Sequence, residues 1–74
     1  MPEYANIVID ISHEKLDKIF QYRIPEALRT DLAVGMRVSV PFGAGNRVTA
    51  GYVVGLTEEA SYDPEKIKEI KGLV

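Results

Sequence analysis

A glycine-rich loop beside one aromatic ring is the segment of this chain best suited to contact a ligand. It runs from Phe42 through Gly43 and Gly45 to Arg47. Glycine lets a ligand approach the main chain, the ring offers a stacking surface, and the arginine adds a positive charge. The same residues are also typical of a plain hairpin turn, in which glycine and Asn46 adopt positive φ, and the ring can equally plug a barrel end. The loop is therefore a candidate contact surface.

This loop does not match the known phosphate-binding loops. Residues 43–47 lack the Lys-Ser/Thr ending of a Walker-type loop and the spacing of a dinucleotide fingerprint. A strand is expected after the loop, whereas both motifs need a helix there to hold the phosphate at its N-terminus. We therefore expect no nucleotide cofactor in this chain.

The chain has few of the residues that usually perform catalysis or bind metals. His13 is the single histidine, and the chain has no cysteine. A metal site needs several such ligands, so His13 is interpreted as a surface residue in a polar turn. Ser12 beside it is too weak a pairing to support nucleophilic catalysis. Neither intrinsic catalysis nor a metal site is expected.

Charged residues gather near the C-terminus. An acidic group lies between residues 58 and 65, and the one dense basic cluster consists of Lys66, Lys68 and Lys71. The acidic group fits either a partner surface or a solvated loop, and the solvated loop is the commoner arrangement. For the lysines the commonest role is a solvated strand edge, where charge prevents edge-to-edge aggregation.

Alternating apolar residues predict the strands that position these groups. Residues 5–11 place Ile7, Ile9 and Ile11 on one face, which indicates a strand rich in β-branched residues. Residues 12–18 form a polar turn. The run 20–24 alternates again, with Gln21 and Arg23 on the face opposite its apolar residues, and a short helical turn follows at 25–28.

The second half of the chain continues this pattern. A strand that begins after Gly35 places Val38 and Val40 inward, and the strand 48–55 follows the glycine loop, with Gly51 indicating a bulge or sharp coil. Residues 67–74 fit either a helix or a strand. We predict a strand there, after a helical turn at Pro64, because a closed barrel needs another partner. The fold class is therefore all-β with minor helical turns: a small five- to six-stranded barrel, OB/SH3-like in size.

Size and composition agree with one small globular domain. A composition of 46% hydrophobic and 27% charged residues argues against disorder, and no apolar run approaches the ~20 residues of a membrane span. The formal net charge of −2 argues against a non-specific nucleic-acid binder, which normally has a basic surplus. It does not argue against a site that holds one strand end. Nothing in the sequence points outside the cytoplasm.

Four segments together resemble one family, the N-terminal 3′ DNA-binding domain of primosomal protein N′, the PriA replication-restart helicase. The most specific is 35–43, Gly-x-Arg-Val-x-Val-Pro-Phe-Gly; the others are an apolar strand at 4–11, Phe-x-Tyr followed by Pro-Glu within 16–26, and Gly-Tyr-Val-Val at 51–54 with the segment 67–70. The resemblance covers nearly the whole chain. It implies a β-rich module that recognises the 3′ end of the leading strand at a stalled fork.

The resemblance also implies a binding pocket for that 3′ end. The family positions fall on Phe20, Gln21, Gly43 and Lys68. A ring there can stack on a terminal base, the glycine lets the sugar approach the backbone, and the lysine can meet a phosphate. Gln21 departs from the family's usual aspartate, but an amide still offers an acceptor and adds a donor. From charge near the loop, not from the family, we add Arg47 and Arg23, with Phe42, as supporting residues.

For the parent protein the resemblance implies an ATP-dependent 3′–5′ DNA helicase with a zinc-binding insertion, which assembles the primosome with other proteins. The residues 1–74 are then a single domain, an excised fragment of that helicase, with no cofactor of its own and some tendency to self-associate. A competing interpretation is an SH3-like interaction barrel that binds a peptide in a groove of Phe20, Tyr22 and Phe42.

Overall fold

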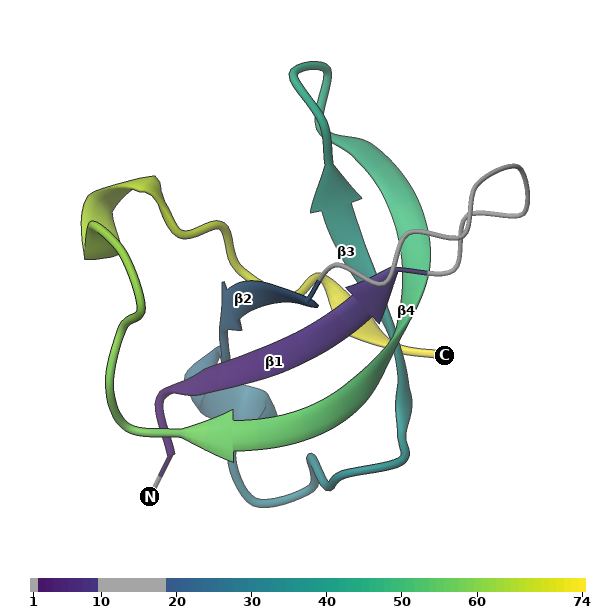
Figure 1. Cartoon of the computed structure of the whole chain (residues 1–74). Helices are drawn as coiled ribbons and strands as arrows, with labels where there is room; N and C mark the ends of the chain where they lie inside the picture. Colours follow the sequence, from purple (N-terminus) through teal and green to yellow (C-terminus); the bar gives the residue numbers. More distant parts are fainter. Residues whose placement is uncertain (1, 10–18) are drawn as a thin grey trace.

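One curved antiparallel sheet carries most of the chain. The computed structural model describes residues 2–9 and 19–74, and its sheet has the order β2-β1-β4-β3-β5 (Figure 1). The strands are β1 (Tyr4–Ile9), β2 (Ile19–Arg23), β3 (Arg37–Phe42), β4 (Arg47–Thr57) and β5 (Gly72–Leu73); the 3₁₀ turns are η1 (Glu26–Leu28) and η2 (Pro64–Lys66). Strands dominate, so the predicted all-β class is confirmed. No helix among the described residues is long and apolar enough to cross a membrane.

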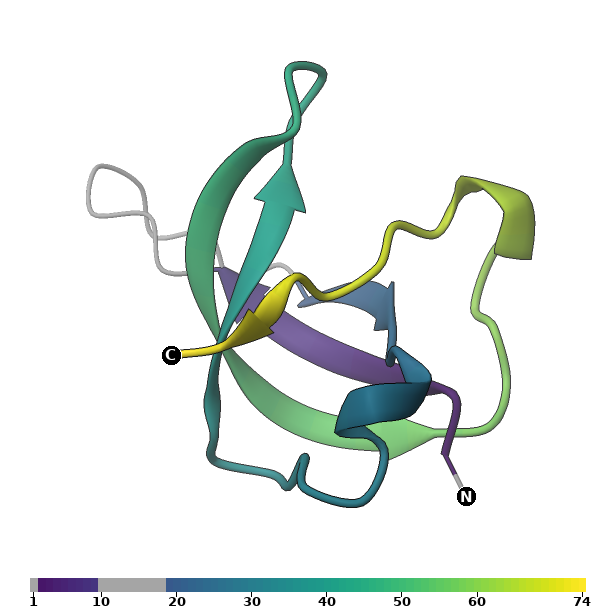
Figure 2. The same cartoon turned by 180° about the vertical axis from the view of Figure 1, so that it is seen from behind.

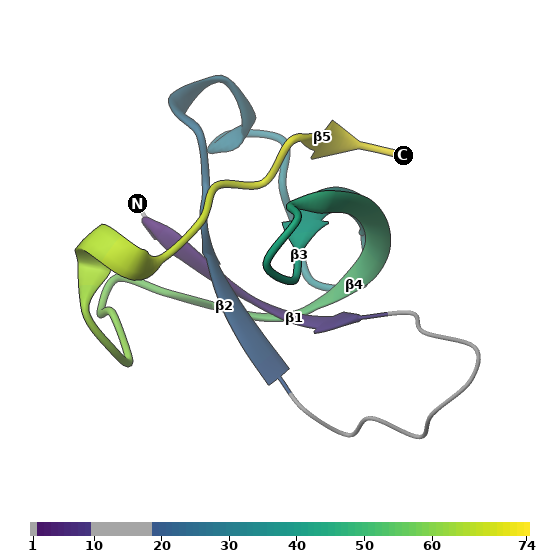
Figure 3. The ribbon, with the colours of Figure 1, turned by 90° about the horizontal axis from the view of Figure 1, so that it is seen from above.

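The long strand β4 gives the sheet its curvature. Its first half pairs with β3 and its second half with β1, and between them the ribbon bends strongly (Figure 2). The sheet then closes on itself through the C-terminal segment. Arg23 N donates to Lys68 O at 2.8 Å and Ile70 N donates to Arg23 O at 3.0 Å, while β5 pairs with β3. This closed sheet is a small barrel, and the view from above shows the C-terminal segment passing along β2 to β5 (Figure 3).

The core lies inside this barrel. Val38 and Val40, which the alternation predicted to face inward, are completely buried, as is Ile7. Alternate residues of β4 behave in the same way, since Val53 is buried whereas Tyr52 is exposed. Apolar burial of this kind is the main stabilising term of a domain without disulfides.

The predicted element boundaries differ in detail. Residues 10–18, with the end of the first predicted strand and the polar turn, lie outside the described residues. The predicted helical turns at 25–28 and at Pro64 are confirmed as η1 and η2. The last strand is shorter than expected. Ile67 and Ile70 are both buried, so their helical spacing reflects two inward contacts of an extended segment and not a helix.

Gly51 marks a close approach between β4 and β1. A Cβ atom at this position would lie 2.5 Å from Ile7 Cγ2 and 2.9 Å from the main-chain oxygen of Val8. The bulge predicted near Gly51 lies three residues further on, at Val54, because Asn6 stands opposite Gly55 and Ile7 opposite Val53. Gly51 is therefore required by the contact with β1.

We expect Gly51→Ala to destabilise the domain by about 1–3 kcal/mol, because the added methyl group overpacks against β1. Gly72→Ala is the matched control, since a Cβ there meets nothing within 4 Å. Urea unfolding followed by circular dichroism measures both. Equal stability of the two variants would contradict the close approach.

Tyr22 joins β2 to β3 through a buried hydrogen bond. Its hydroxyl donates to Pro41 O at 2.8 Å, and the side chain is only 4% exposed. Burial, with a smaller contribution from nearby Tyr62, raises the pKa of Tyr22 to about 12 from 10.0. The folded state therefore retains a proton that the unfolded state has lost between these two values.

The free energy of unfolding should consequently fall as the pH rises from about 10 to about 12, with the Tyr22 contribution intact below pH 10. Tyr22→Phe removes the titrating group and should flatten that part of the profile. Denaturant unfolding at a series of pH values tests this. Parallel profiles for the two proteins would show that Tyr22 does not carry the effect.

Candidate nucleic-acid interface

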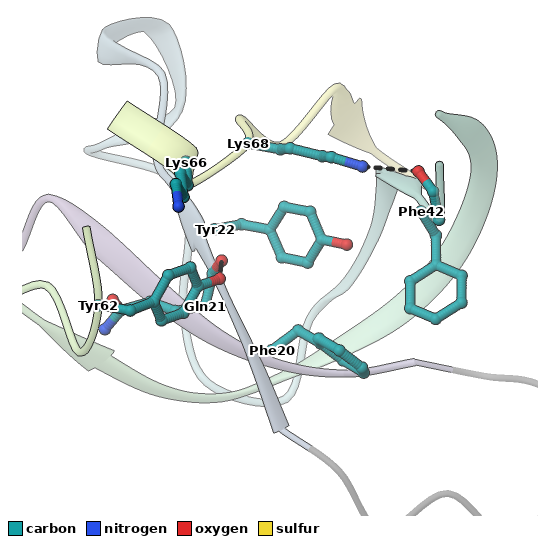
Figure 4. Close-up of a pocket in the computed structure, with 8 residues that line it drawn as sticks. Phe20, Gln21, Tyr22, Phe42, Tyr62, Lys66 and Lys68 are labelled. Atoms are coloured by element: carbon teal, nitrogen blue, oxygen red, sulfur yellow. Dashed lines mark hydrogen bonds between the residues drawn. The ribbon is translucent and has the colours of Figure 1, made fainter. Parts of the chain in front are cut away.

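A pocket of about 250 Å³ opens where β2, the end of β3 and the C-terminal segment meet (Figure 4). It is lined by Phe20, Gln21, Tyr22, Phe42, Gly43, Tyr62, Lys66 and Lys68. These residues come from three separate parts of the chain. The barrel closure between β2 and the segment that carries Lys68 is what brings them together.

All four residues expected to bind a strand end line this one pocket, namely Phe20, Gln21, Gly43 and Lys68. Of the supporting residues, Phe42 lines it as well. Arg47 does not; it is exposed at the start of β4. Arg23 instead lines a separate, more open hollow beside Glu65 and Glu69. The charge pattern of the sequence predicted both arginines as supporting residues of the site, but neither lines the pocket.

Two phenylalanine rings form one side of the pocket. Phe20 and Phe42 meet edge to face, with ring centroids 5.2 Å apart and an interplanar angle of 81°. Both are half-buried and pack against the core. Such pairs stabilise by about 0.5–1.5 kcal/mol beyond the area they bury, so the rings form a firm wall. Phe42 therefore packs against the core and also lines the pocket.

The glycine loop is a tight hairpin turn that one lysine holds. Gly43 and Asn46 both have positive φ (75° and 50°), and Asn46 N donates to Gly43 O at 3.1 Å. Lys68 Nζ also donates to Gly43 O, at 2.7 Å. An ammonium group has three donors, so Lys68 can bind this carbonyl and an anion together. Space around Gly43 is open, since a Cβ there would meet nothing within 4 Å.

The side-chain amide of Gln21 forms hydrogen bonds within the protein. Among the described residues it is the buried polar side chain, only 4% exposed. Its Nε2 donates to Glu59 O at 3.0 Å, and its Oε1 accepts from Ser61 N at 2.7 Å. The amide that was expected to contact DNA therefore bonds the main chain of the 59–62 segment. Alternation could not reveal the burial of Gln21, because that burial goes with contacts to a distant segment.

Sequence reasoning missed two of the lining residues as site residues. Tyr62 lies in the acidic segment that was interpreted as a solvated loop, and Lys66 in the cluster interpreted as a strand edge. The signal that could have identified Tyr62 is its position as the one aromatic residue of that acidic loop. Tyr22 also lines the pocket, although its hydroxyl points to Pro41.

The resemblance implies zinc and a nucleotide for the parent protein, and the part of the chain that the structure describes can be compared with what such sites need. Among the residues that the structure describes, no three His, Cys, Asp or Glu side chains are grouped as metal ligands. His13 lies outside that part of the chain. The glycine loop leads into β4 and not into a helix, so it lacks the helix N-terminus that phosphate-binding loops use.

Comparison with known proteins identifies the family. Residues 6–74 match the family model described as the 3′ DNA-binding domain (3′BD) of PriA. The chain is 34% identical over 71 residues to the replication restart protein PriA of Bacillus subtilis (strain 168), an alignment that covers 96% of this chain. It spans 9% of the length of that protein. No solved structure matches.

The family match covers nearly all of the chain, including the glycine loop and the pocket that it borders. The relative agrees with it over the same extent. This chain belongs to the family of PriA 3′ DNA-binding domains.

Proposed function

We propose that the pocket binds the 3′ end of the leading strand at a stalled replication fork. The observation that carries this proposal is the convergence of Phe20, Gly43 and Lys68, from three segments, on one pocket. Aromatic faces, an open main chain and a cation are what a terminal base, its sugar and its phosphate need. The family's description as a 3′ DNA-binding domain supports the same ligand.

The size of the pocket favours the end of a strand over a continuous strand. A volume of about 250 Å³ is slightly below the ~300–1,000 Å³ of sites for drug-sized ligands. One nucleoside is a ligand of this scale. Two lysines beside the pocket supply local positive charge in a chain whose net charge is −2. Binding should therefore depend on one or two phosphates and have a shallow salt dependence.

The peptide-binding alternative is less well supported. It requires Tyr22 as part of an aromatic groove, but Tyr22 is 4% exposed and its hydroxyl bonds Pro41 O. A proline-rich peptide added in excess should therefore not displace DNA.

For the longer protein we propose the role that the family resemblance implies. It would be a cytoplasmic, ATP-dependent 3′–5′ DNA helicase with bound zinc that restarts replication with other primosome proteins. The present domain would supply fork-end recognition and no catalysis. Self-association of the isolated domain stays a prediction.

The proposal predicts that a fork with a free 3′-OH leading end binds at least about tenfold more tightly than the same fork with a 3′-phosphate. The added phosphate group would take up the space at Gly43 into which the terminal sugar is proposed to pack, and would so displace the sugar from the main chain. Fluorescence anisotropy with labelled forks measures both affinities. Equal affinities would refute recognition of the strand end.

Two substitutions locate this binding in the pocket. Lys68→Ala should weaken binding of the 3′-OH fork about tenfold and lower the salt slope by about one. Lys71→Ala removes an exposed lysine outside the pocket and should change neither quantity.

Gly43→Val should also weaken binding of the 3′-OH fork. Its control is Gly35→Val, because Gly35 has the same kind of positive φ and open surroundings but lies away from the pocket. If each variant behaves like its control, the pocket is not the binding site.

A further inference from the structure

Three hydrogen bonds attach the segment 59–62 to a single residue of β2. The Gln21 amide donates to Glu59 O and accepts from Ser61 N, and the Tyr62 hydroxyl donates to Gln21 O at 2.9 Å. A carboxylate at position 21 accepts but does not donate, so it cannot form the bond to Glu59 O. A glutamine is therefore chemically suited to hold this segment, in a way that an acid is not.

The attachment brings an aromatic ring to the pocket. Tyr62 lies beside Gln21, across Tyr22 from Phe42 in the close-up view (Figure 4). Its hydroxyl is bonded, which restricts the orientation of the ring, yet the side chain is 48% exposed. A ring that is held in place at the wall of a pocket and is still accessible is a suitable stacking surface for a base.

We propose that Tyr62 stacks on the unpaired base of the strand end, and that Gln21 is the positioning residue that holds it there. The inference rests on the proposed function, because it assumes a nucleotide in the pocket. Phe20 and Phe42 then bound the pocket on one side and Tyr62 on another. Because Gln21 is only 4% exposed and its amide already bonds Glu59 O and Ser61 N, the base is held by ring contact and not by this amide.

The test compares two forks with a free 3′-OH, one ending in thymidine and one ending in an abasic tetrahydrofuran residue. The natural chain should bind the thymidine end about tenfold more tightly, as stacking on one aromatic ring typically gives. Tyr62→Ala should remove most of that preference, with a remainder from the Phe20 ring, and leave the affinity for the abasic end unchanged. Tyr62→Phe, which retains the ring, should keep most of the preference.

Tyr52→Ala serves as the matched control, because Tyr52 is similarly exposed but lies on β4 outside the pocket. It should retain the full preference for the thymidine end. An undiminished preference in Tyr62→Ala, or an equal loss for both ends, would overturn the stacking role. The equal loss would indicate that Tyr62 only supports the pocket.

Gln21→Glu tests the positioning role. It should speed hydrogen exchange of the amides at 59–62 and reduce the preference for the thymidine end, while the discrimination between 3′-OH and 3′-phosphate persists. If exchange at 59–62 is unchanged and the 3′-OH discrimination falls, Gln21 contacts DNA directly and the inference is wrong.

These experiments distinguish failure of the proposed function from failure of the inference. If the natural chain does not discriminate between a 3′-OH and a 3′-phosphate end, both the proposed function and the inference are wrong. Intact 3′-OH discrimination combined with an unchanged base preference in Tyr62→Ala would refute the inference alone.

Discussion

Closure of the barrel between β2 and the C-terminal segment is the constraint on which the rest of the structure depends. Two main-chain hydrogen bonds at Arg23, to Lys68 and Ile70, join segments more than forty residues apart. They bury Ile70 in the core and direct the Lys68 side chain across the pocket to the glycine turn. Without them β2 would be an open edge, and the lysine would have no fixed relation to the rings of Phe20 and Phe42.

The pocket is shaped as much by polar contacts as by the core. The bond from Lys68 to Gly43 O ties the turn to the C-terminal segment, and the Gln21 amide ties the 59–62 segment to β2. A buried amide without partners would cost about 1–3 kcal/mol, so satisfying it stabilises the fold while it shapes the pocket wall. Stability and site geometry therefore share the same few bonds, in a small domain with a limited core.

Much of this arrangement could be predicted from local sequence. Alternation identified the inward faces of Val38 and Val40, and the turn residues Gly43 and Asn46 marked the hairpin, because both signals depend on neighbouring residues only. The burial of Gln21 and the position of Tyr62 at the pocket could not be predicted, because both depend on hydrogen bonds between residues about forty positions apart. The family resemblance gave the pocket residues, whereas charge alone favoured arginines that do not line it.

The most direct test of the pocket as the DNA-end site is an NMR titration of the ¹⁵N-labelled domain with a short single strand bearing a free 3′-OH. We predict that amide shifts concentrate at Phe20, Gly43 and Lys68. Shifts on the exposed outer residues of β4, at Tyr52 and Val54, with the pocket amides unchanged, would contradict the account.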